Sequence, residues 1–197
     1  MNLEFIEAFF APGEVSEIWL TFSDPQLKSE NSRLTSPLFL ERYRKFLSPG
    51  GVIHLKTDSR FLHEYTKAVA LENDLAVLAA TTDLYGDDLL PSVGGVHPAT
   101  VATLGHVRGG TAGEAGGGVR GADVERVDTS TEGLLALYEV QTFYEKMFLS
   151  QGYKITYLAF NIDHEGPYKH PTTFDSDYWR SIEGPRRFSH SPTSSQR

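Results

Sequence analysis

One stretch decides the fold: Ile18-Trp19-Leu20-Thr21-Phe22-Ser23-Asp24-Pro25-Gln26-Leu27-Lys28. Its apolar run stops at Ser-Asp-Pro, as a buried strand does where it brings a carboxylate to the carboxyl edge of a sheet. Because Pro25 cannot continue a strand ladder and biases Asp24 toward an extended conformation, the carboxylate has a fixed position. A second apolar run, residues 52–57, ends at Asp58. Ligands of open α/β sheets bind outside the carboxyl ends of the strands, so Asp24 and Asp58 predict one pocket.

Helices and strands alternate around these two strands. Ser36 as N-cap and Pro37 at the first helical position predict a helix, which Pro49-Gly50-Gly51 should end. The periodicity also predicts helices over residues 2–10 and 60–71, and strands over residues 15–22, 52–57 and 75–80. This order indicates a parallel α/β sheet.

The composition changes after residue 90. Ten of the eighteen glycines fall between Gly94 and Gly121, without aromatic residues or periodicity, which predicts a flexible insertion. Its literal G-x-G-x-x-G match, residues 116–121, follows no strand and is rejected as a dinucleotide-binding loop. An amphipathic helix over residues 134–152 and a strand over residues 153–162 follow. We therefore predict one domain formed by residues 1–90 and 134–162, an insertion over residues 91–133, and a disordered tail over residues 163–197.

Composition and charge exclude several classes of protein. No apolar run approaches the length of a membrane span, and there are no cysteines, so we expect a soluble, cytoplasmic protein without disulfides or sulfur-bound zinc. The net charge of -8 argues against a surface built to neutralise many phosphates. Residues 24–67 reverse this balance, with five acids against eight basic residues: Lys28, Arg33, Arg42, Arg44, Lys45, Lys56, Arg60 and Lys67. This window is either an ordinary solvated surface or a contact for nucleic acid.

Two blocks of the sequence resemble the bacterial tRNA (guanine-N7-)-methyltransferase family. The first comprises residues 14–26, Lys28, residues 33–36 and the closing run His54-Leu55-Lys56-Thr57-Asp58. The second, residues 142–148, is similar to the family's Thr-x-(Phe/Tyr)-Glu signature. The blocks occur in the family's order, and the resemblance covers residues 2–85 and 135–162.

The resemblance implies a Rossmann-like class I methyltransferase fold and transfer of a methyl group from S-adenosyl-L-methionine to N7 of the guanine at position 46, in the variable loop of tRNA. It implies that Asp24 is catalytic and contacts the cofactor. No metal is expected, because the seven histidines lack the spacing of metal ligands. Arg33, beside Lys28, is expected to contact tRNA phosphate. The implied substrate-binding residues are Lys28, Asp58, Thr142, Phe143, Tyr144 and Glu145.

Each of these residues also has an ordinary structural role open to it. Asp24 before Pro25 can form a simple turn, and Asp58 can cap the next helix. Thr142 and Glu145 satisfy the pattern of a capping box. The alternative function is a non-catalytic α/β module that binds RNA or a partner protein.

The sequence departs from the family in two places. The family begins with a strand and a glycine-rich cofactor loop, and neither precedes the first strand here. We therefore expect the carboxyl-terminal part of the fold, truncated at the N-terminus, with weak cofactor binding and self-association through an uncovered sheet edge. The loop after Asp24 is also less basic than the family's, and Gln26 stands where the family often has Trp.

Overall fold

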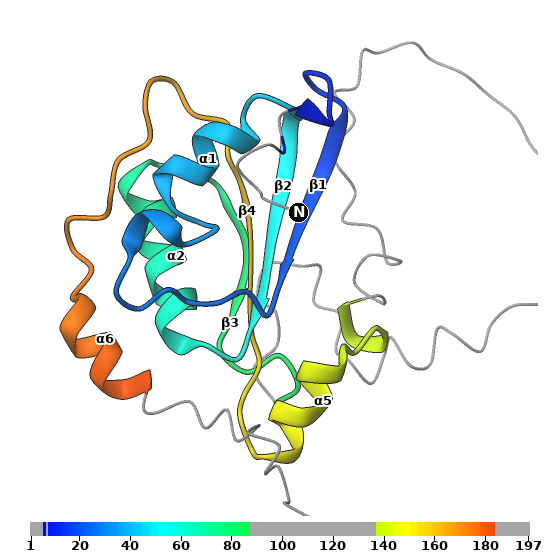
Figure 1. Cartoon of the computed structure of the whole chain (residues 1–197), viewed down its shortest axis with the longest axis vertical. Helices are drawn as coiled ribbons and strands as arrows, with labels where there is room; N and C mark the ends of the chain where they lie inside the picture. Colours follow the sequence, from blue (N-terminus) through cyan, green and yellow to red (C-terminus); the bar gives the residue numbers. More distant parts are fainter. Residues whose placement is uncertain (1–5, 7, 87–136, 184–197) are drawn as a thin grey trace, which may run out of the picture.

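The computed structural model describes residues 6, 8–86 and 137–183, which form a four-stranded sheet with helices around it (Figure 1). The strands are β1 (Val15–Thr21), β2 (Leu47–Thr57), β3 (Val77–Thr81) and β4 (Thr156–Asn161), in the order β1-β2-β4-β3. β1 and β2 pair in parallel, whereas β4 is antiparallel to both β2 and β3. The predicted α/β class is confirmed. The sheet is mixed rather than parallel, because the last strand enters between the second and the third.

The helices are the 3-10 turn η2 (Glu30–Ser32) and α1 (Pro37–Tyr43), α2 (Arg60–Glu72), α5 (Phe143–Ser150) and α6 (Ser176–Glu183). α1, α2 and α6 lie together to one side of the strands, and α5 lies apart from them at the lower end of the sheet in Figure 1. No helix within the described residues is long and apolar enough to cross a membrane.

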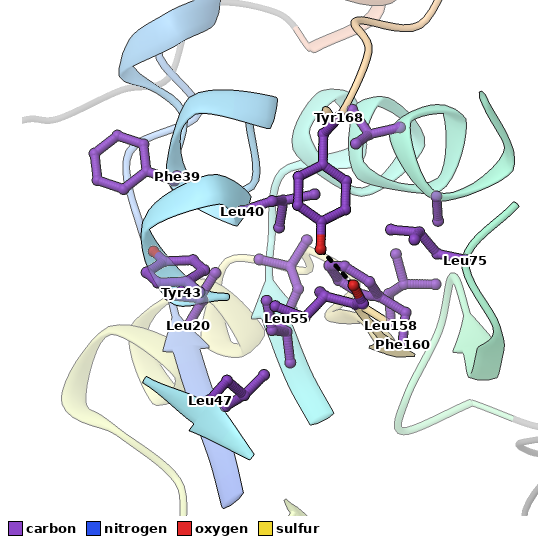
Figure 2. Packing of buried hydrophobic residues seen from close by; sticks show 14 of the residues in the cluster. Leu20, Phe39, Leu40, Tyr43, Leu47, Leu55, Leu75, Leu158, Phe160 and Tyr168 are labelled. Carbon is purple, nitrogen blue, oxygen red and sulfur yellow. Dashed lines mark hydrogen bonds between the residues drawn. The ribbon is translucent and has the colours of Figure 1, made fainter. Parts of the chain in front are cut away.

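The face of the sheet toward α1 and α2 is covered by apolar contacts (Figure 2). Leu55 of β2 and Leu158 and Phe160 of β4 are fully buried against Leu40 and Tyr65 of the two helices. The chain beyond β4 closes this layer, because the hydroxyl of buried Tyr168 donates to the carbonyl of Ile162 (Figure 2). This face is the main hydrophobic core.

The opposite face has a smaller apolar cluster, packed against α5. Val52, Ala79 and Ala159 from three strands meet Leu137 there, with Phe148 of α5 at its margin. Side chains alternate along β2, so His54 and Lys56 point to the same face as Val52. Both are about 97% buried, since their exposed fractions are 3%. This second face therefore places polar groups where the first has leucine.

Three predicted boundaries need correction. α1 ends at Tyr43, and Pro49-Gly50-Gly51 lies inside β2. Its pairing register with β1 shifts between Val15 and Glu17, and Gly50 has a φ of +76°, so this segment is a bulge rather than a helix stop. The helix predicted over residues 134–152 is also interrupted: residues 137–139 are helical, and α5 begins only after Thr142.

The prediction of a disordered tail is wrong for residues 163–183. The amide side chain of Asn73 pairs with both backbone groups of Lys169 at 2.9 and 2.7 Å, which ties the tail to the end of α2. Glu183 accepts a hydrogen bond from the backbone of Phe61 at 2.9 Å, which ties α6 to the start of α2. Most of the predicted helix over residues 2–10, the insertion over residues 91–133 and the tail beyond Glu183 lie outside the described residues.

Candidate functional site

The loop that follows β1 has an unusual backbone. Phe22 and Gln26 have φ values of 51° and 46°, a region that non-glycine residues rarely occupy. Between them, the carboxylate of exposed Asp24 accepts a hydrogen bond from the backbone of Gln26 at 2.8 Å, so the turn expected as an alternative does form. The turn leaves the second carboxylate oxygen to solvent or a ligand. Two strained residues flanking one exposed carboxylate are typical of a functional loop.

Arg33 is a buried residue that contacts the backbone of this loop. Its guanidinium lies over the rings of Phe61 and Tyr65, at 4.7 and 4.2 Å from their centroids, and donates to the carbonyl of Gln26 at 3.3 Å. The residue is only 2% exposed, and burial lowers its pKa. The predicted phosphate contact is therefore wrong, since α2 covers the charge that a phosphate would need to reach.

The first turn of α5 is fixed by a buried ionic network. The side chain of Thr142 accepts from the backbone of Glu145, whose carboxylate accepts from the backbone of Thr142, so the expected capping box is confirmed. The ammonium of Lys56 lies 2.7 Å from the Glu145 carboxylate and donates to the carbonyl of Leu137 at 2.5 Å. The hydroxyl of Tyr85 donates to the same carboxylate at 2.6 Å. This Lys56 network joins β2, the chain after β3, and α5.

Both members of the ion pair are buried, with side-chain exposures of 4% for Lys56 and 0% for Glu145. Burial lowers the pKa of Lys56, while the hydrogen bond and charge of Glu145 oppose this shift. Removing one partner of such a pair would leave an uncompensated charge. Glu145, expected to touch substrate, therefore contacts protein groups in this structure.

A hollow of about 310 Å³ lies beside the Lys56 network. It lies between the end of β1 and the start of α5. The ring of Phe22, directly after β1, stacks on that of Phe148 in the last turn of α5. Most of the exposed wall of the hollow is apolar, although four of its seven lining residues have polar or charged side chains. A pocket of this kind suits a flat ligand with a polar edge. The lining residues are Trp19, Thr21, Lys56, Leu137, Val140, Thr142 and Glu145.

Asp58 lies in a second hollow, of about 260 Å³, at the same edge of the sheet. The expected alternative role of Asp58 as a helix cap is wrong, because the side chain of Ser59 caps α2 by accepting from Leu62 at 3.1 Å. Arg60 and Lys154 also line this hollow, and each is in an ion pair, Arg60 with Glu64 at 2.8 Å and Lys154 with Asp83 at 2.7 Å.

The predicted substrate-binding residues therefore do not all lie in one hollow. Thr142 and Glu145 line the first hollow and Asp58 the second, whereas Asp24 lines neither, so these two hollows are not the single pocket predicted for Asp24 and Asp58. Phe143 and Tyr144 are 74% and 54% exposed on α5, and Lys28 is exposed on the loop after Asp24.

Sequence reasoning did not predict five residues that line the first hollow, namely Trp19, Thr21, Lys56, Leu137 and Val140. A signal for Lys56 was present, since it is the one charged residue in the apolar run over residues 52–57. A larger hollow, of about 440 Å³, lies at the opposite end of β2 beside Arg44 and Asp163, away from every predicted site residue. Among the described residues, no group of three or more His, Asp or Glu side chains could hold a metal ion.

Comparison with known proteins bears on this arrangement. Residues 1–93 match a family model described as "Putative methyltransferase". The tRNA (guanine-N(7)-)-methyltransferase of Bacteroides thetaiotaomicron is 38% identical over 187 residues, which are 94% of this chain and 57% of that protein. The protein of the same name from Porphyromonas gingivalis is 34% identical over 188 residues, which are 94% of this chain and 59% of that protein.

This chain belongs to the tRNA (guanine-N(7)-)-methyltransferase family. The resemblance drawn from the two sequence blocks is thereby confirmed, and the α/β sheet agrees with the Rossmann-like fold of such methyltransferases. The chain spans 57% and 59% of the length of these two methyltransferases. A shorter match, to the tRNA (guanine-N(7)-)-methyltransferase of Listeria monocytogenes, is 39% identical over 89 residues.

Proposed function

We propose that this chain takes part in transferring a methyl group from S-adenosyl-L-methionine to N7 of a guanine in tRNA, at position 46 of the variable loop. The supporting observation is the hollow of about 310 Å³ between the end of β1, which leads into the strained Asp24 loop, and the capped start of α5. It has room for one purine base and joins the two sequence blocks that resemble the family. A tRNA substrate also implies action in the cytoplasm.

Methyl transfer to guanine mainly requires that N7 is aligned with the methyl group of the donor. Guanine N7 has an in-plane lone pair, so no strong base is needed to make it a nucleophile, and holding N7 in line with the methyl carbon supplies much of the acceleration. The lone pair forms the new N–C bond, the C–S bond breaks with its electron pair left on sulfur, and the positive charge passes from sulfur to the purine. A carboxylate fixed near the purine stabilises this charge as it develops. Asp24 has the chemistry for that role.

The described residues fit the methyl donor only in part. Asp24 offers a carboxylate at the carboxyl edge of β1, where it can accept hydrogen bonds from the donor's ammonium or hydroxyl groups. None of the described helices follows a glycine-rich turn of the kind that cradles such a cofactor. We therefore assign to the described residues the binding and orientation of the guanine, with Asp24 at the boundary between base and cofactor.

The tRNA backbone needs positive charge near this hollow. Two exposed lysines are available, Lys28 on the loop after Asp24 and Lys154 before β4. Arg60, at the start of α2, lines the second hollow together with Lys154. We assign these three side chains to phosphate contacts, which set the register of the RNA without reading its sequence. Phe143 and Tyr144 are exposed aromatic rings on which neighbouring bases can stack.

Lys56 and Glu145 act as positioning residues in this proposal. Their ion pair fixes the start of α5, and with it Thr142 at the wall of the hollow. Small displacements of a positioning group cost large factors in rate, since the reacting atoms must stay in line.

Methyl transfer to transcribed tRNA at saturating S-adenosyl-L-methionine tests this function. We expect labelled methyl groups to appear as 7-methylguanosine, and the Asp24→Asn variant to be about 100-fold slower. The matched control is Asp74→Asn, which changes an exposed aspartate at the end of α2 that lines neither hollow. A transcript made with 7-deazaguanosine has no N7 and should accept no methyl groups. Equal transfer to that transcript, or tRNA binding with no transfer at all, contradicts the proposal.

A further inference from the structure

We propose that Trp19 is the surface on which the target purine stacks, and that its indole ring favours the methylated, positively charged base over the neutral one. This inference rests on the proposed function and adds the residue that distinguishes product from substrate.

The indole of Trp19 is held in place on one side. Trp19 of β1 and His54 of β2 are partners in the parallel ladder, and their rings stack with centroids 4.0 Å apart and planes within 5°. The indole N–H donates to the carboxylate of Glu17 at 3.0 Å. A ring fixed by a stacked neighbour and a hydrogen bond loses little entropy when a ligand binds.

The rest of the indole remains available. Trp19 is 39% exposed, although its partner His54 is 3% exposed, and Trp19 lines the hollow together with Val140 and Leu137. These three side chains are the apolar part of the lining, so a base that enters can stack on an aromatic ring beside apolar side chains. Stacking of a base on an aromatic side chain is worth roughly 1–3 kcal/mol by alanine substitution, and every base has a face that can stack.

The ring beneath Trp19 carries no positive charge at neutral pH. Burial lowers the pKa of His54 to about 4, although the charge of Glu17, 3.7 Å from its Nε2, opposes this shift. The Nδ1 of His54 lies 2.8 Å from the hydroxyl of Tyr157. A neutral imidazole does not compete for the π electrons of the indole. A cation on the exposed side of Trp19 therefore meets a full cation–π partner.

Charge on the purine grows as the methyl group is transferred. A face that attracts cations binds the purine more tightly at that stage than before it, which is the condition for lowering a barrier. The same attraction predicts that free 7-methylguanosine, kept cationic at pH 6, binds better than guanosine. Cation–π contacts of this kind correspond to a preference of roughly 3- to 30-fold.

Tryptophan fluorescence tests the inference without any methyl transfer. The chain has two tryptophans, so the Trp179→Phe variant leaves Trp19 as the only reporter. We expect 7-methylguanosine at pH 6 to quench its emission, with a dissociation constant 3- to 30-fold below that of guanosine. Equal affinities, or no quenching while tRNA is methylated normally, would overturn the inference and leave the proposed function intact.

Trp19→Phe and Trp19→Leu give a second measurement, by calorimetric titration of the same two nucleosides. The phenyl ring should keep part of the preference and leucine none of it. Tyr178→Leu, which removes a 55% exposed ring on α6, is the matched control and should keep the full preference. If Trp19→Leu is folded by circular dichroism and still prefers 7-methylguanosine, Trp19 is not the stacking surface.

Discussion

The two faces of the sheet bury comparable residues of β2 in opposite ways. Ile53 and Leu55 are fully buried against α1 and α2, while His54 and Lys56 are 3% exposed on the other face. The first face is stabilised by apolar burial, which has no preferred direction. The second is stabilised by specific partners, namely Trp19 for His54 and Glu145 for Lys56.

The face with buried polar groups is also the face that carries the candidate site. Contacts between apolar side chains tolerate changes of similar volume, whereas buried polar groups demand their own partners. The face of the sheet that carries His54 and Lys56 is the one that borders the hollow of about 310 Å³. We infer that the polar network fixes the geometry of the site, and that the apolar core supplies stability.

The largest expected effect comes from Lys56→Met, which keeps the volume of the side chain but leaves the Glu145 carboxylate buried without its cation. We expect a loss of about 3–5 kcal/mol in the free energy of unfolding. Urea unfolding followed by circular dichroism measures it. The double variant Lys56→Met/Glu145→Gln removes both charges and should recover most of the loss. A double variant as unstable as the single one argues against the ion pair as the cause.

Leu55→Ala probes the apolar face. It should cost about 3 kcal/mol of unfolding free energy in the same urea experiment, because a fully buried leucine leaves a cavity. Leu71→Ala, which truncates a 64% exposed leucine at the end of α2, should cost less than about 0.5 kcal/mol. Similar costs for the two variants would contradict the core described here.

The stability of the protein should depend on pH through His54, which lies on the polar face of the sheet. The pKa of His54 is about 4 in the folded protein, below its ordinary value of 6.5, so the unfolded chain binds this proton at higher pH. Stability from His54 is therefore fully present above pH 6.5 and is lost as pH falls toward 4, by about 3 kcal/mol. Unfolding measured at several pH values should show this loss in wild type and not in His54→Gln. An identical pH dependence in the two proteins would show that His54 titrates normally.

The smallest effect concerns the helix cap. Thr142→Ala removes the hydroxyl that accepts from the backbone of Glu145 at 3.2 Å, and should cost about 1 kcal/mol in thermal or urea unfolding. Thr142→Ser keeps the oxygen and should be close to wild type. If serine is as destabilising as alanine, the methyl group of Thr142 matters rather than its hydrogen bond.

Local sequence signals predicted the strand before Asp24, the Ser36-Pro37 helix start and the Thr142 capping box, because each depends on residues within a few positions. Long-range pairing escaped prediction. β4 pairs with β2 across about 100 residues of sequence. The local sequence of residues 156–161 does not indicate that this strand lies between β2 and β3.

Long-range contacts also explain why the predictions for Arg33 and for the tail were wrong. Arg33 lies in a polar loop, and the rings of Phe61 and Tyr65 that bury it come about 30 residues later. The segment after Asp163 has a polar composition, yet Tyr168 and the contacts of Asn73 hold it on α2 and β4. Thr142 of the hollow was among the predicted residues, whereas Trp19 was missed, because its stacked neighbour His54 lies in the adjacent strand.

One measurement tests the central claim that the polar face sets the geometry of a guanine site. It is the kcat/KM for methylation of tRNA by the Lys56→Met/Glu145→Gln double variant, compared with wild type at a temperature where both are folded. We predict a loss of about 100-fold, because the start of α5 is no longer fixed against β2. A double variant that methylates tRNA as efficiently as wild type would contradict the account.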